Sequence, residues 1–145
     1  MSTINSMNVS ASGMTAQRLR MDIISQNIAN VSTTRDEYGN VYKRKAVVFA
    51  EKDVSSFGDY LMRTTGTVGN GVKVTSIIED NEAEMRKIYD PSHPDADEDG
   101  YVTYPNVNIV QEMTDLIDAS RSFEANVTAF NAGKNMALKG LEIGK

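Results

Sequence analysis

The stretch NVNIVQEMTDLIDASRSFEANVTAFNAGKNMALKGL, residues 106–141, decides the fold, because its apolar side chains recur at alternating steps of four and three. The resulting seam is Ile109, Met113, Leu116, Ser120, Phe123, Val127, Phe130, Lys134, Ala137 and Leu141. This spacing keeps one stripe of a helix facing a partner helix, and it predicts a coiled-coil strand of about 35 residues, roughly 50 Å long. A second apolar row, Val110, Ile117 and Leu138, adjoins the seam and requires further neighbours.

A partner helix is predicted at the other end of the chain, over residues 1–31. Asn5, Ser6 or Asn8 is expected to cap its start, and its seam at the same spacing is Met7, Ala11, Met14, Arg18, Met21, Ser25 and Ile28. The run NIANVSTT, residues 27–34, ends the helix near Val31, because its side chains compete for backbone hydrogen bonds. Asn27 and Asn30 are expected to satisfy backbone groups at that end.

The segment between the helices has the alternation of short strands. Strands are predicted within residues 41–50, 72–78 and 85–89, and an extended piece at residues 101–104, whereas residues 51–63 are expected to be irregular. The fold class is therefore mainly α, with long terminal helices forming an antiparallel coiled-coil pair and a small β-rich middle segment. The predicted domains are a discontinuous helical one, residues 1–31 and 106–145, and the middle segment, residues 32–105.

Composition excludes several functions. The 145 residues carry a formal net charge of −5 and no cysteine. Nucleic acid is not an expected partner, because binding it requires a basic surface, and disulfides and thiolate metal sites are excluded. No apolar run approaches the roughly 20 residues of a bilayer span, so direct membrane insertion is not expected. The N-terminus lacks the pattern of a cleaved signal peptide.

Two loops carry candidate contact residues. Lys43, Arg44 and Lys45 form a basic cluster at the entrance of the first strand. The cluster either discourages edge-to-edge pairing of strands or contacts an acidic surface of a neighbouring subunit. His93, the single histidine, has no partner at triad or metal spacing and is interpreted as a hydrogen-bonded loop residue. No acid and base pair is found, so an enzyme is not predicted, and no cofactor is expected.

The run DADEDGYVT, residues 95–103, resembles the start of an EF-hand calcium loop. Asp95, Asp97 and Asp99 occupy its first ligand positions, but Asn106 stands where a bidentate glutamate is required. Prolines upstream also prevent the entering helix. A solvated acidic turn is favoured, and a calcium-regulated binding module remains the second hypothesis.

Several segments resemble a known family, the bacterial flagellar rod, hook and hook-associated proteins. These are SQNIANVSTT (25–34), YKRK (42–45), YDPSHPDAD (89–97), GYV (100–102), PNV (105–107), EM (112–113), ASRSFEAN (119–126) and KNM (134–136). The Asn-Ile-Ala-Asn run marks the wider family, and the proline-rich run is similar to that of its proximal-rod members. Val41 and Tyr38 depart from the family pattern, which affects only a loop.

The resemblance implies a structural subunit of the basal-body rod, the drive shaft that crosses the periplasm around the export channel. It implies export through the flagellar type III apparatus without a cleaved signal peptide. Its implied partners are other rod proteins, copies of itself and the ring-to-rod adaptor. The sites it implies are interfaces: the seam residues of both helices, the bend at residues 27–34 and the loop at residues 89–97.

Overall fold

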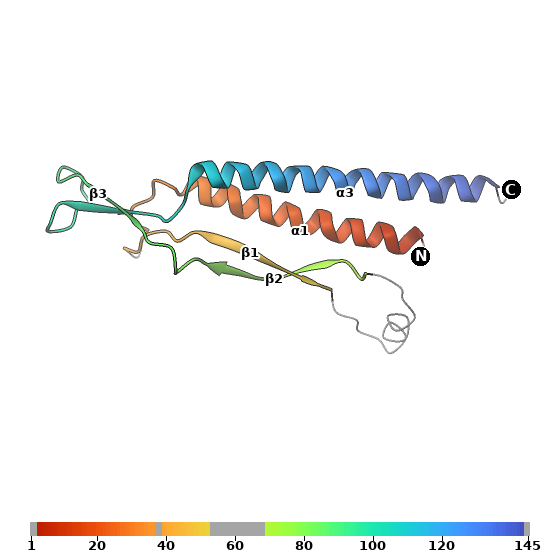
Figure 1. Ribbon diagram of the computed structural model, residues 1–145, viewed down its shortest axis with the longest axis horizontal. Coiled ribbons are helices and arrows are strands. Elements are labelled where there is room, and N and C mark those ends of the chain that lie inside the picture. Colours follow the sequence, from red (N-terminus) through yellow and green to blue (C-terminus); the bar gives the residue numbers. More distant parts are fainter. Residues whose placement is uncertain (1–2, 37–38, 53–68, 144–145) are drawn as a thin grey trace.

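The computed structural model describes residues 3–36, 39–52 and 69–143, and its main feature is an antiparallel pair of long helices (Figure 1). Helix α1 spans Thr3–Ala29 and helix α3 spans Ile109–Ile143. The N- and C-termini lie at the same end of the pair (Figure 1). The predicted fold class, two long terminal helices with a β-rich insertion, is confirmed.

The helix ends are fixed by asparagine side chains. Asn108 caps α3, since its Oδ1 accepts the N–H groups of Val110 at 3.0 Å and Gln111 at 3.4 Å. Asn30 Nδ2 donates to the Gln26 carbonyl at 2.8 Å, where α1 ends. The predicted caps of α1 are wrong: the helix already runs from Thr3, so Asn5, Ser6 and Asn8 lie inside it.

The middle segment forms two antiparallel ribbons. Strand β1 (Lys45–Glu51) pairs with β2 (Val72–Glu79), and β3 (Arg86–Tyr89) pairs with β4 (Tyr101–Tyr104). The β1–β2 ribbon packs against α1, so α1 lies between α3 and this ribbon (Figure 1). The predicted strands are confirmed, whereas most of the predicted irregular stretch falls in residues 53–68, outside the described residues.

The stripe of α3 that faces α1 shares only part of the predicted seam. Leu116, Phe123, Phe130 and Ala137 belong to both and are half-buried. The alternate positions are displaced by one residue toward Glu112, Ala119, Asn126 and Gly133, which are buried or contact α1, whereas Met113 and Lys134 are exposed.

Close approach of the two helices explains this displacement. A Cβ added to Gly133 would lie 3.1 Å from Met7 Cγ, and one added to Gly13 would lie 2.8 Å from Asn126 Oδ1. At both points a side chain of one helix fills the space above a glycine of the other, and a larger residue would not fit there. Met113, which hydrophobicity placed inside, is 53% exposed on the outer side of the pair.

Candidate functional site

Asn27 is fully buried where α1, α3 and β1 meet, and each polar atom of its side chain is hydrogen-bonded. Its Nδ2 donates to the Lys45 carbonyl at 2.8 Å and to Glu112 Oε2 at 2.9 Å. Its Oδ1 accepts the Lys45 N–H at 3.0 Å and the Tyr42 hydroxyl at 2.9 Å. This uses the full capacity of an amide side chain, which has two donors and two acceptor positions. Asn27 therefore joins β1 to both helices.

Glu112 is the second fully buried polar residue of this junction. Its Oε1 accepts a hydrogen bond from Arg44 Nε at 2.6 Å. The Arg44 guanidinium also lies 3.6 Å from Asp115, which lies 3.5 Å from Arg20 of α1. A buried carboxylate is tolerated only when it is paired, and the first turn of a helix favours negative charge. Arg44 thus neutralises this buried acid, which connects α3 to the rest of the chain.

Tyr42 and Asn106 extend the junction into the loops. Burial raises the pKa of the Tyr42 hydroxyl above its ordinary 10.0, and the negative charges of Glu112 and Glu79 add to this effect. The hydroxyl therefore stays protonated and keeps donating to Asn27. Asn106 Oδ1 accepts the Arg44 N–H at 2.9 Å, and its Nδ2 donates to the Asp80 carbonyl at 3.0 Å.

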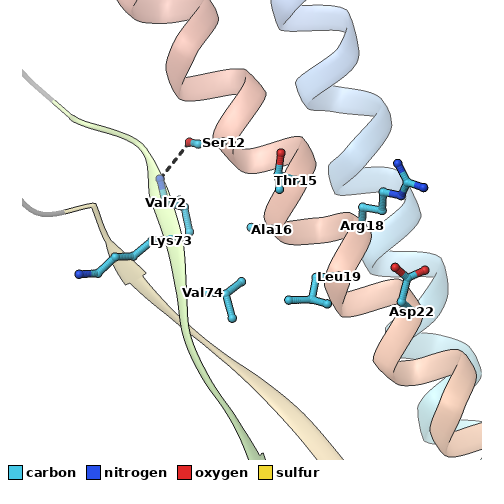
Figure 2. A pocket seen from close by; sticks show the side chains of 9 residues that line it. All are labelled: Ser12, Thr15, Ala16, Arg18, Leu19, Asp22, Val72, Lys73 and Val74. Atoms are coloured by element: carbon cyan, nitrogen blue, oxygen red, sulfur yellow. Dashed lines mark hydrogen bonds between the residues drawn. The ribbon is translucent and has the colours of Figure 1, made fainter.

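A groove with a volume of 380 Å³ runs between α1 and β2 (Figure 2). Its lining residues are Ser12, Thr15, Ala16, Arg18, Leu19, Asp22, Val72, Lys73 and Val74. At one end, Ser12 Oγ accepts the Val72 N–H at 3.0 Å and ties β2 to α1 (Figure 2). Gly71, the residue before Val72, has φ of +90°. A Cβ on it would collide with the Ser12 hydroxyl, so the close approach of this loop to α1 requires glycine.

The residues predicted as interface positions separate into three groups by burial. The half-buried residues are Met7, Met14, Met21, Ile28, Asn30, Leu116, Phe123, Val127 and Phe130. Exposed on α3 are Ile109 (45%), Met113 (53%) and Leu141 (71%). Asn27 is the buried member described above. Contacts of these residues with neighbouring subunits stay a prediction.

The three basic residues before β1 have different surroundings. Arg44 belongs to the buried junction, an intramolecular role that the sequence did not suggest. Lys43 Nζ donates to Asn81 Oδ1 at 2.6 Å, and Lys45 Nζ lies 5.6 Å from the centre of the Tyr42 ring. Both lysines therefore lie near the surface around the junction.

The loop before β4 is held by its own polar groups. His93 is half-buried, and its Nδ1 accepts the Asp95 N–H at 3.1 Å. Asp95 accepts the Thr34 hydroxyl at 2.6 Å and lies 3.7 Å from Arg35 Nε. Asp97 and Asp99 are exposed. In the part of the chain that the structure describes, no three acidic, histidine or cysteine side chains could hold a metal ion together. The geometry therefore offers no support for the calcium hypothesis.

Helix α3 leaves large apolar side chains uncovered near both of its ends. Near its start these are Ile109, Val110, Met113 and Ile117, between 45% and 74% exposed, and near its end they are Met136, Leu138 and Leu141, between 49% and 71% exposed. Among the described residues, no helix is long and apolar enough to cross a membrane. Patches of this kind usually mark a protein interface.

Comparisons with known proteins agree with these surfaces. A family model described as flagella basal body rod protein matches residues 7–35, and one described as flagellar basal body rod FlgEFG protein C-terminal matches residues 98–143. The flagellar basal-body rod protein FlgC of Bacillus subtilis is 49% identical over the full length of both chains. FlgC of Borreliella burgdorferi is 44% identical, with 99% of this chain and 98% of the relative covered. FlgC of Escherichia coli O6:H1 is 36% identical over the full length of both chains.

Proposed function

We propose, because the chain belongs to the FlgC family of flagellar basal-body rod proteins, that it assembles through α1 and α3 into the proximal rod around the export channel. The chain is a structural subunit of the rod and not an enzyme. In the proposal, residues 1–31 and 106–145 form the assembling helical domain, and residues 32–105 form a β-rich segment beside it.

The outer face of α3 is the observation that carries this proposal. Val110 and Ile117 are 74% and 51% exposed, although α3 already has α1 as a partner on its other side. Burying apolar surface yields about 25 cal/mol per Å², so each such side chain gains roughly 1.5–3 kcal/mol when a neighbour covers it. The isolated chain does not gain this free energy, whereas a chain packed among other rod helices does.

Membership of the family implies association with other rod components. We further propose that the immediate neighbours are other rod proteins, copies of this chain and the ring-to-rod adaptor. Delivery by the flagellar type III export apparatus, without a cleaved signal peptide, would bring the chain to the periplasmic part of the basal body.

The test adds charge to the apolar face. Val110→Asp/Ile117→Asp should abolish swimming in soft agar and remove the subunit from isolated basal bodies, while secreted subunit remains detectable in the medium. The matched control Gln111→Asp/Ala125→Asp adds the same charge at exposed positions of α3 outside the apolar patch and should swim normally. Normal rods containing the Val110→Asp/Ile117→Asp chain would contradict the proposal.

A further inference from the structure

We infer that the Asn27–Glu112 hydrogen bond sets the register of α1 against α3. The two helices could otherwise pair in a second register, displaced by one heptad. The pair is buried, and its atoms are 2.9 Å apart. A single buried polar residue is known to specify register in coiled coils, where apolar contacts alone do not.

The repeat along α3 is what makes a second register possible. Leu116, Phe123, Phe130 and Ala137 recur every seven residues on one line of the stripe. On the other line, Ala119, Asn126 and Gly133 are followed by Gly140. A Cβ added to Gly133 would meet Met7 Cγ, whereas one added to Gly140 would meet nothing within 4 Å. Gly140 could therefore accept Met7 as Gly133 does.

The unequal helix lengths leave room for the displacement. Helix α3 has 35 residues and α1 has 27, so α3 extends past the start of α1. Displacement toward this overhang would place Met7 opposite Gly140 and Asn27 opposite Ala119. The opposite displacement would carry Asn27 past Ile109, where α3 begins. One alternative register therefore competes with the native one.

The polar junction makes the two registers differ in free energy. In the displaced one, Asn27 would face the methyl group of Ala119, and Glu112 would lose the amide that now donates to it. Leaving buried polar groups without partners is unfavourable, and it is more so for a carboxylate. The apolar line of α3 repeats every seven residues and is offered in both registers, so the loss at the junction favours the native one.

Engineered disulfides can report the register, because the chain has no cysteine of its own. Met7→Cys/Gly133→Cys reports the native register, and the Sγ of Met7→Cys takes the place of Met7 Cγ, the atom that a Cβ on Gly133 would meet. Met7→Cys/Gly140→Cys reports the displaced one. Both are oxidised in the purified full-length chain, under conditions where circular dichroism shows the helices formed. We expect the native disulfide to exceed the displaced one by at least about tenfold.

Two variants test the cause of this preference. Asn27→Leu/Glu112→Leu should bring the displaced disulfide to a yield comparable with the native one. Glu112→Leu/Ala119→Glu moves the carboxylate by one heptad and should make the displaced disulfide the major product. The matched control is Asn126→Ala, in the same stripe, because Asn126 Nδ2 donates to the Ser122 carbonyl of its own helix at 2.8 Å. It should leave the ratio unchanged.

An unchanged preference for the native disulfide in both variants would overturn the inference. Loss of helix in both variants would overturn it as well, because the pair would then stabilise the helices without choosing their register. The measurement is intramolecular and requires no rod, so its failure leaves the proposed function unaffected.

Discussion

Removing the cation at the buried junction should destabilise the chain more than any other single charge change described. Arg44→Met keeps most of the aliphatic stem but removes the guanidinium that donates to Glu112 at 2.6 Å. Breaking a buried ion pair costs about 3–5 kcal/mol. The Arg44 side chain is 28% exposed, so water can partly replace it, and we expect a loss of about 2–3 kcal/mol. This is a large share of the roughly 5–15 kcal/mol that stabilises a typical domain.

The assay is urea unfolding of the purified full-length chain, followed by helix circular dichroism. Adding Glu112→Gln to Arg44→Met should recover at least half of the loss, because a neutral amide requires no cation. Lys43→Met is the matched control, since the Lys43 ammonium bonds only the exposed Asn81 among the described residues, and it should change stability by less than about 0.5 kcal/mol. Equal unfolding midpoints for Arg44→Met and the parent chain would refute the reasoning.

Three further outcomes are expected. Phe123→Ala removes a half-buried ring from the α1–α3 contact and should cost about 3 kcal/mol in urea unfolding and abolish swimming; full swimming would show that the seam tolerates this cavity. Stability should decline as the pH rises above about 10, because the unfolded chain loses the Tyr42 proton before the folded chain does; Tyr42→Phe should remove this part of the decline in unfolding measured against pH, and an identical pH profile would argue against it. Asp97→Asn should leave swimming intact because Asp97 is exposed, and a non-motile strain would assign the acidic loop a role in contact or ion binding.

The elements of this fold were predictable because their signals are local. The long heptad rhythm of residues 106–141 predicts α3, and short alternation predicts the strands. Hydrophobicity failed at Met113, which it placed toward α1. Packing of side chains across the two helices, which no local pattern contains, favours Ala119 and Gly133 there instead. The exposed Met113 and Ile109 are then free for neighbours outside the chain.

The hydrogen-bond partners in the junction could not be predicted from local sequence patterns. Asn30 does satisfy the end of α1, as predicted, but Asn27 turns instead to the backbone of Lys45. Glu112 resembles an ordinary acidic residue in the first turn of a helix, and its partner Arg44 is 68 residues away in the sequence. Only the structure shows that the heptad line of Ala119 faces α1, and Glu112 lies on that same line. An acid at an inward position requires a buried cation or donor.

The antiparallel pairing of the first and last segments has a consequence for the timing of synthesis. Asn27 and Glu112 are 85 residues apart, so the partner of α1 leaves the ribosome long after α1 itself. At about 5–20 residues per second, the delay is about 4–17 s. Throughout that interval the inward face of α1 lacks α3 and is available to a chaperone that binds apolar helices. Helix α1 therefore cannot pair with α3 until translation is nearly complete.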